Sequence, residues 1–228
     1  MNNPIPSVDL FGEPISDVLS PMLVKATGYG SHRPLLVLAL SWFNTRGAGT
    51  PRLGTIYEFG TGHGSTPFLQ DVSRWRQSTL VSLDSDEEWF FKFYPREIDR
   101  PGPRGVIGAI TTPRDAGIVR FQGWDDVPLD TMGPRSIDLA FIDHAPGERR
   151  HVELTRLIDK ATFVVVHDSE QDGAGDYKLE PVLWRYAYRL NDYPGGAGTT
   201  LVSNYVDVTS PAWVEGLAAV RSVANLLA

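Results

Sequence analysis

The chain has 228 residues, of which 42% are hydrophobic and 21% charged, so it can bury one large core within a single domain. A net charge of -7 argues against the basic face that general nucleic-acid binding requires, and no nucleic-acid partner is expected. The lack of cysteine excludes disulfides, thiol nucleophiles and thiolate metal sites.

The N-terminal segment predicts helices rather than a targeting signal. It lacks a basic start followed by an apolar run, and the longest apolar run, residues 35–42, is too short to cross a bilayer. Helical spacing of apolar residues predicts helices over 14–27 and 33–46, with Gly28 and Gly47 as stops. We therefore expect a cytoplasmic protein with no membrane partner.

From residue 54 onward, short β-rich runs alternate with longer helical ones, as in βαβ units on a parallel sheet. The predicted parallel strands are 55–59, 79–84, 105–110, 137–143 and 162–168. The predicted crossover helices are 65–76, 86–94 and 148–160. The expected fold class is therefore α/β, with a Rossmann-like, doubly wound and mostly parallel sheet preceded by N-terminal helices.

The last third of the chain changes character. A helix over 176–184 leads into two alternating runs, 185–191 and 199–208, which predict an antiparallel hairpin at one sheet edge. A final helix is expected over 211–227, and residues 117–128 are expected to form a small insertion. The predicted organisation is one domain, 1–228, with a helical extension (1–53), a catalytic core (54–208) and a C-terminal helix (209–228).

The first predicted strand runs into YEFGTGHGS, with glycines at alternate positions. Gly60 and Gly62 can let a ligand approach the backbone, and the N-terminus of the next helix offers free N–H groups. A phosphate-binding P-loop is excluded because no Gly-Lys pair exists in the chain. A dinucleotide fingerprint would place glycine at position 65, where Ser65 stands, and would not place an acid at Glu58.

A second acid, Asp84, ends the second strand 24 residues after Gly60, which suits hydrogen bonds to two ribose hydroxyls. Together with IDLAFIDHAPG at the fourth strand, these features resemble class I S-adenosylmethionine-dependent methyltransferases over roughly residues 54–208. The resemblance implies S-adenosylmethionine as cofactor. It assigns to cofactor binding the residues Glu58, Gly60, Thr61, Gly62, Ser65, Asp84 and Asp143.

Strands four and five end in FIDH and VVVHDSE, which place Asp143, His144, His167 and Asp168 beside the expected cofactor. Methyl transfer to a hydroxyl requires positioning and loss of the hydroxyl proton. In one mechanism His144 or His167 is the general base, and Asp143 and His144 are the expected catalytic residues. In the other, Asp143 and Asp168 bind Mg²⁺, which lowers the pKa of the acceptor oxygen.

FIDH is similar to the metal-binding motif of catechol O-methyltransferases, although Ser169 and Pro146 replace an Asn and a catalytic Lys of that family. HAPGERRH resembles a loop of small-molecule and sugar O-methyltransferases. The resemblance implies a small polar or sugar-like acceptor. The N-terminal helices are expected to cover the active site or to join copies in a homo-oligomer.

Three other interpretations stay open. One is a nicotinamide-dependent oxidoreductase, which Glu58, Ser65 and the terminal hairpin disfavour, and another is a catalytically silent methyltransferase-like subunit that binds other proteins. The turn can also be a plain strand-to-helix connection, and Asp143 a helix cap. Arg149 and Arg150 are expected on a solvated helix start, and the role of His63 is undetermined.

Overall fold

The computed structural model of the protein describes residues 9–11, 13–14, 19, 23, 31–44, 52–95, 105–170, 177–193 and 197–227. Its strands are β1 (Asp9–Leu10), β2 (Glu13–Pro14), β3 (Thr55–Phe59), β4 (Thr79–Asp84), β5 (Val106–Thr111), β6 (Ala116–Phe121), β7 (Ile137–Ile142), β8 (Ala161–His167), β9 (Tyr188–Asp192) and β10 (Thr199–Ser203). Its helices are α1 (Arg33–Trp42), α2 (Thr66–Arg76), α3 (Glu87–Phe90), η3 (Trp124–Asp126), η4 (Gly147–Arg149), α4 (Arg150–Arg156), α6 (Glu180–Leu183) and α7 (Pro211–Leu227).

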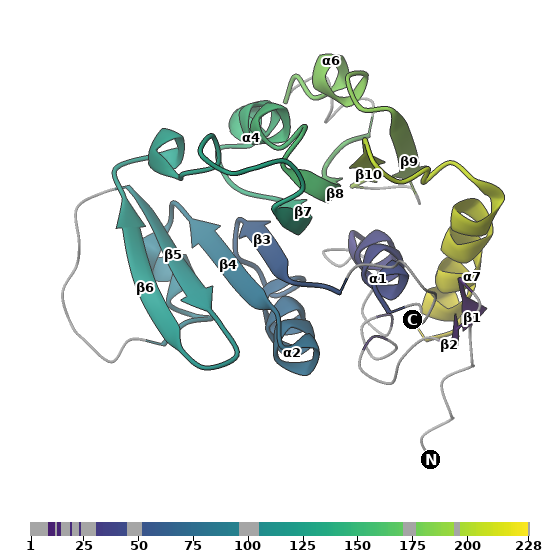
Figure 1. The fold of residues 1–228 in the computed structure, drawn as a ribbon, viewed down its shortest axis with the longest axis horizontal. Helices are drawn as coiled ribbons and strands as arrows, with labels where there is room; N and C mark the ends of the chain where they lie inside the picture. The colour runs from purple at the N-terminus through teal and green to yellow at the C-terminus, as the bar shows by residue number, and fades with distance from the viewer. Residues whose placement is uncertain are drawn as a thin grey trace.

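One sheet of eight strands crosses the molecule in the order β6-β5-β4-β3-β7-β8-β10-β9 (Figure 1). The four central strands β4, β3, β7 and β8 are parallel to their neighbours within this group. The hairpin β5–β6 flanks them at one edge and β9–β10 at the other, and both are joined to the centre by antiparallel pairing. The predicted α/β class and C-terminal hairpin are confirmed, but the expectation of a mostly parallel sheet is wrong, because the sheet is mixed.

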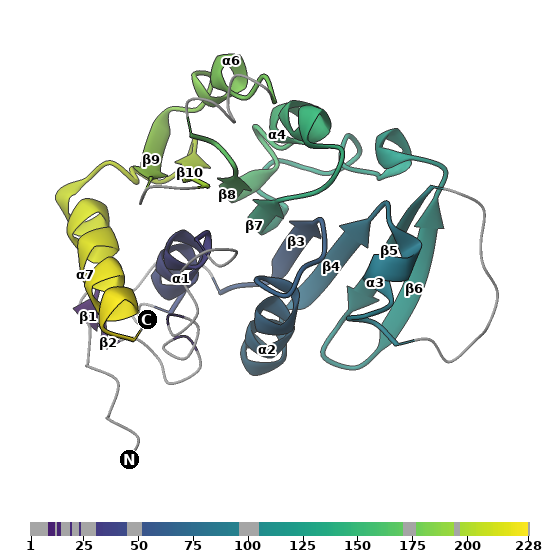
Figure 2. The ribbon, with the colours of Figure 1, turned by 180° about the vertical axis from the view of Figure 1, so that it is seen from behind.

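Helices cover both faces of the central strands. Leu139 and Phe141 of β7 belong to a buried cluster with α1, α2 and α7, whereas Ala140 and Ile142 belong to a second cluster with α4 and α6. Figures 1 and 2 show these helix groups on opposite sides of the strands. The alternation follows from the two-residue period of a strand, and burial on both faces explains the continuous apolar runs in the sequence.

The predicted third parallel strand and the predicted insertion after it form one antiparallel hairpin. β5 runs against β4, with Leu83 opposite Gly108, so the parallel direction expected for residues 105–110 is wrong. Most of the expected insertion, 117–128, lies in β6 and η3. The hydrophobic pattern of a strand carries no information on its direction, which depends on how the preceding connection returns to the sheet.

Three predicted helices are shorter than their apolar spacing indicated. The helix expected over 86–94 is α3, which begins where Asp86 accepts a hydrogen bond from the Trp89 backbone N–H and ends at Phe90. The helix expected over 148–160 is a turn of 3₁₀ helix, η4, followed by α4, which ends at Arg156. The helix expected over 176–184 is α6, Glu180–Leu183, and residue 176 lies outside the described residues.

The N-terminal predictions differ in outcome. α1 confirms the helix expected from residue 33 but ends at Trp42, and residues 45–46 of the prediction lie outside the described residues. Most of the helix expected over 14–27 also lies outside them. Its first residue, Pro14, instead pairs with Asp9 in the two-stranded sheet β1–β2.

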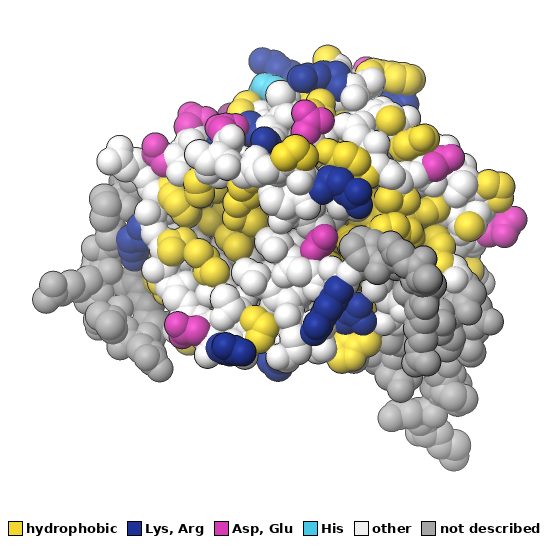
Figure 3. All heavy atoms as spheres, viewed as in Figure 1, with side chains coloured by type: hydrophobic (Ala, Val, Ile, Leu, Met, Phe, Trp, Pro, Cys, Tyr) yellow, Lys and Arg dark blue, Asp and Glu magenta, His cyan; other side chains and the backbone are white. Residues whose placement is uncertain are grey.

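No helix in the described parts of the chain is both long and apolar enough to span a bilayer. On the face drawn in Figure 3, acidic and basic side chains lie among hydrophobic ones.

Candidate functional site

Backbone packing determines the conformation of the glycine turn between β3 and α2. Gly60 has a φ of +93°, and a Cβ there would lie 2.6 Å from the backbone of both Asp143 and His144. The C-terminal ends of β3 and β7 are joined by a hydrogen bond of 2.8 Å from the Asp143 N–H to the Phe59 carbonyl. Gly60 is therefore required for the close approach of β3 and β7, independently of any ligand.

Glu58 organises the turn from within the core. Its fully buried carboxylate accepts hydrogen bonds from the hydroxyls of Ser65 (2.6 Å), Thr66 (2.9 Å) and Ser82 (2.6 Å). Burial raises the pKa of Glu58 to about 7, although the three hydroxyl donors oppose the shift. Glu58 and Ser65 were predicted to bind a cofactor. Both are buried, and they bond to one another.

Asp84 connects the end of β4 to the turn. Its Oδ2 accepts hydrogen bonds from the backbone N–H (2.8 Å) and the hydroxyl (2.7 Å) of Thr61, and its Oδ1 accepts one from the Asp86 N–H. The Thr61 carbonyl in turn accepts a hydrogen bond of 2.7 Å from the indole N–H of Trp89. A carboxylate has about four acceptor positions, and three donors from the described residues contact Asp84, which leaves one position on Oδ1 for a further donor.

Gly62 is a residue of the turn with open space around it among the described residues. A Cβ there would meet only the Ser65 hydroxyl, at 3.8 Å, and the Gly64 backbone N, at 4.0 Å, in this part of the chain. Its neighbour His63 is exposed and lies edge-on to Trp89 and Phe93. The open backbone at Gly62 is thus bordered by aromatic side chains of the α3 region.

The start of α1 lies against the turn. The Arg33 guanidinium donates hydrogen bonds to the carbonyls of Gly64 (2.9 Å) and His63 (3.4 Å), and the Arg33 side chain is largely buried. Burial lowers the pKa of Arg33. The helix expected to cover the active site therefore contacts the predicted cofactor turn directly.

Asp143 and His167 form the centre of the second group of candidates. Ile142 pairs with Val166, and one further step in this parallel register brings Asp143 opposite His167. The Asp143 Oδ1 lies 3.2 Å from the His167 Nδ1, and the His167 Nε2 lies 2.9 Å from the Ser31 hydroxyl. Asp143, His167 and Ser31 thus form a continuous chain of hydrogen bonds.

The charges of this pair stabilise one another. Burial disfavours ionised Asp143, but the His167 hydrogen bond and the positive charges of His167 and Arg150 outweigh it, and the pKa of Asp143 is lowered. Burial likewise disfavours charged His167, but Asp143 and Asp168 outweigh it, and the pKa of His167 is raised. Asp143 is therefore a carboxylate at neutral pH.

Arg150 joins the two carboxylates that the sequence assigned to Mg²⁺. Its guanidinium lies 3.0 Å from Asp143 and 2.8 Å from Asp168, donates to the carbonyls of His144 and His167, and stacks over Tyr177. A buried guanidinium already balances the negative charge that would attract a hard cation. The arrangement of Asp143 and Asp168 therefore does not fit a Mg²⁺ ion held between them, and the expectation of a solvated Arg150 is wrong.

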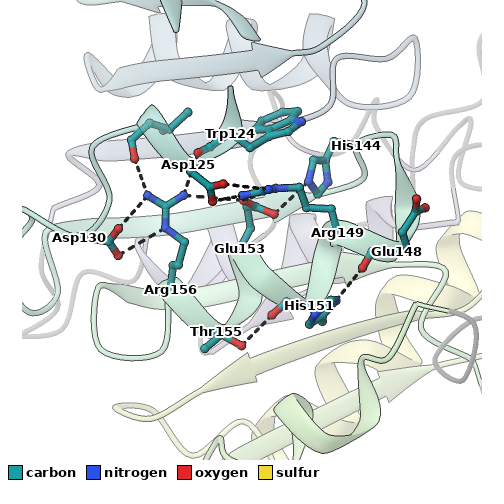
Figure 4. A network of polar contacts seen from close by, with 11 residues as sticks. Trp124, Asp125, Asp130, His144, Glu148, Arg149, His151, Glu153, Thr155 and Arg156 are labelled. Carbon is teal, nitrogen blue, oxygen red and sulfur yellow. Dashed lines mark hydrogen bonds and ion pairs between the residues drawn. The ribbon is translucent and has the colours of Figure 1, made fainter. Parts of the chain in front are cut away.

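His144 lies on the opposite face of the sheet from Asp143. Its ring is fully buried, 3.2 Å from Glu153 and 4.4 Å from the Trp124 ring centroid, within the network of Figure 4. Arg149 contacts Glu153 and Asp125 in the same network. His144, predicted to be catalytic, has the surroundings of a core histidine and takes no part in the Asp143–His167 group.

His32, just before α1, is a member of the site that sequence reasoning missed. Its ring lies 4.7 Å from Phe141 and edge-on to His167 at 5.2 Å between centroids. Only 2% of His32 is exposed, and neither ring nitrogen has a hydrogen bond of good geometry among the described residues, although the Gly64 backbone lies nearby. Burial lowers the pKa of His32 to about 3, so the ring is neutral.

A hollow of about 370 Å³ between α2 and the β5–β6 turn, lined by Arg74, Tyr94 and Pro113 among others, lies at the opposite end of the central strands. The structure directs the side chain of His144 away from the other predicted site residues, although its backbone contacts Gly60. The predicted residues that it brings together are Glu58, Gly60, Thr61, Gly62, Ser65, Asp84, Asp143 and Asp168. Comparison with protein-family models, curated proteins and solved structures finds no match for this chain.

Proposed function

We propose that the protein is a Rossmann-like, S-adenosylmethionine-dependent methyltransferase that methylates a hydroxyl of a small-molecule or sugar-like acceptor. The observation that carries this proposal is the position of the glycine turn. The chain passes from β3 to β4 on one side and returns to β7 on the other. In open α/β sheets, ligands bind at such a reversal, beyond the carboxyl ends of the strands.

The residues around the turn suit a nucleoside with a cationic remainder. Gly62 leaves its backbone open, and Asp84 Oδ1 retains an acceptor position for a ribose hydroxyl. Asp143, a carboxylate at neutral pH, follows the neighbouring strand and lies next to the turn. S-adenosylmethionine supplies an electrophilic methyl group on a sulfonium sulfur.

The acceptor side of the proposal rests on Asp143 and Asp168, whose side chains are 28% and 26% exposed. A hydroxyl nucleophile must lose its proton as it attacks. Asp143 is partly exposed, and its Oδ1 lies 3.2 Å from His167 Nδ1, so a proton taken up by this pair can be shared between the two groups. The catalytic base is therefore assigned to Asp143 with His167, in place of His144.

Binding of S-adenosylhomocysteine, the product form of the cofactor, tests the proposal by isothermal titration. Gly62→Ala adds a methyl group that meets no atom of the described residues closer than 3.8 Å, so its thermal midpoint should match the wild type. The same methyl group projects over the turn, and it should weaken S-adenosylhomocysteine binding at least tenfold, or about 1.4 kcal/mol. Gly117→Ala, in equally open surroundings on β6, is the matched control and should bind normally.

Each alternative gives a different result in this experiment. Absence of heat with millimolar S-adenosylhomocysteine would overturn the proposal in favour of a silent, methyltransferase-like subunit. Binding of NAD without binding of S-adenosylhomocysteine would identify an oxidoreductase. Equal affinity of wild type and Gly62→Ala would show that the ligand does not lie against the turn.

A further inference from the structure

The buried ring of His32 has two polar nitrogens without a hydrogen bond of good geometry among the described residues. A buried polar group without a partner costs roughly 1–3 kcal/mol, so such groups are rare unless something else satisfies them. A ring whose only role were packing against Phe141 would be served as well by phenylalanine. The nitrogens of His32 therefore point to a ligand.

Two other donors face the same space. One ligand atom each from His32, Asp143 and His167 can be chosen so that all three lie within 4.8 Å of one another. We propose that His32, Asp143 and His167 bind one divalent transition-metal ion of the zinc type. Two imidazoles and one carboxylate are a donor set for zinc or iron, whereas Mg²⁺ prefers oxygen ligands and retains water.

The surroundings orient these donors. The Ser31 hydroxyl bonds to His167 Nε2, which leaves Nδ1 directed at Asp143. A metal-bound histidine commonly has its second ring nitrogen held by a neighbouring polar group in this way. Among the described residues, the shortest contacts of the Asp143 carboxylate to His167 and Arg150 both involve Oδ1, and Oδ2 accepts no hydrogen bond.

The fit requires a small contraction. Ligand atoms about 2.05 Å from a tetrahedral zinc ion lie about 3.4 Å from one another. In the structure these ligand atoms lie within 4.8 Å of one another, so each side chain must move about 1 Å toward the ion. Asp143 must then contact both the ion and Arg150. Because Asp143 is the most exposed of the three, the open coordination position lies on its side, next to Gly60.

Ion binding at this site does not depend on methyl transfer. If the protein is the proposed methyltransferase, an acceptor hydroxyl bound to the ion at the open position would have a lowered pKa. Only this effect of the ion on the acceptor rests on the proposed function.

The test uses the full chain without a polyhistidine tag, stripped with EDTA and freed of chelator. The protein is incubated with Zn²⁺, desalted, and its metal content is measured by mass spectrometry. The wild type should retain one ion per chain, and excess Mg²⁺ should not displace it. Bound Co²⁺ should give visible absorption bands that report nitrogen and oxygen coordination.

His32→Phe should lose the ion while keeping a thermal midpoint at or above that of the metal-free wild type, because an apolar ring replaces two nitrogens that make no hydrogen bond of good geometry with the described residues. Asp143→Asn, which preserves shape, should weaken Zn²⁺ binding at least tenfold. His151→Ala removes a histidine that contacts the Glu148 carbonyl away from the site, and it should bind Zn²⁺ normally.

The proposed metal site would be refuted if the wild type failed to retain Zn²⁺, if His32→Phe retained it, or if Mg²⁺ displaced it. Titration of the same stripped protein with S-adenosylhomocysteine separates this outcome from the proposed function. Cofactor binding without metal retention contradicts only the metal site, and the reverse contradicts only the proposed methyltransferase.

Discussion

Glu58 should make the stability of this protein fall as the pH rises toward neutrality. Its carboxyl group is fully buried, and burial raises its pKa from an ordinary 4.5 to about 7. Between these values the folded protein holds a proton that the unfolded chain has released. Stability therefore decreases with rising pH over this window and no longer changes, as far as this group is concerned, above pH 7.

The size of the effect follows from the pKa. Each tenfold difference in proton affinity is worth about 1.4 kcal/mol, so a pKa of about 7 in place of 4.5 costs the folded state about 3 kcal/mol once Glu58 is ionised. This is a large fraction of the 5–15 kcal/mol that typically stabilises a folded domain. Glu58→Gln removes the titration while keeping an acceptor oxygen for the Ser65 and Thr66 hydroxyls.

The assay is urea unfolding followed by tryptophan fluorescence, at intervals from pH 4.5 to 8, for the wild type and Glu58→Gln. The stability of the variant relative to the wild type should increase by about 3 kcal/mol across this range. Asp71→Asn is the control, because Asp71 is 65% exposed and pairs with an equally exposed Arg74. A Glu58→Gln difference that stays constant with pH would refute the buried, proton-binding carboxyl group.

Two other substitutions test the packing of the site by urea unfolding at pH 7. Gly60→Ala should cost about 3 kcal/mol or more, because the new Cβ overlaps backbone atoms and the φ is unfavourable, whereas Gly62→Ala should stay within about 1 kcal/mol of wild type. Equal stabilities would contradict the close approach of β3 and β7. Arg150→Leu should cost about 3 kcal/mol, because it leaves two carboxylates without their shared cation, and Arg74→Leu on the surface less than about 0.5. A cost below about 1 kcal/mol for Arg150→Leu would show that Arg150 does not bridge Asp143 and Asp168.

The central strands and the glycine turn could be predicted because their signals are local. The runs that became β3, β4, β7 and β8 are apolar, short and bounded by helical patterns, and the structure reproduces them within a residue or so. The turn at Gly60 is made of consecutive residues. Its connection to Asp84 required only the rule that neighbouring parallel strands end at the same edge of the sheet.

Local patterns could not predict the antiparallel direction of β5 or the places of His32 and Arg150 in the site. Each depends on contacts between distant segments: β5 on the return of a connection that local pattern does not specify, His32 on the docking of α1 against β7 and β8. Arg150 stands at a helix start, where arginine is usually solvated. It is buried here because α4 begins directly against the ends of two strands that carry acids.

The pairing of Asp143 with His167, rather than with His144, follows from a rule that the sequence already contained. Side chains alternate between the two faces of a strand, so consecutive residues such as Asp143 and His144 point to opposite faces as long as the chain stays extended. Phe141 and Val165 are cross-strand neighbours in one core cluster, and Asp143 and His167 continue their two strands by the same step. Two strand ends of the form apolar-Asp-His and apolar-His-Asp therefore place their unlike residues side by side when their apolar residues, Ile142 and Val166, are paired with each other. The short sequence motif suggested an Asp–His pair within one strand, whereas sheet geometry forms that pair between two strands and leaves His144 to the core.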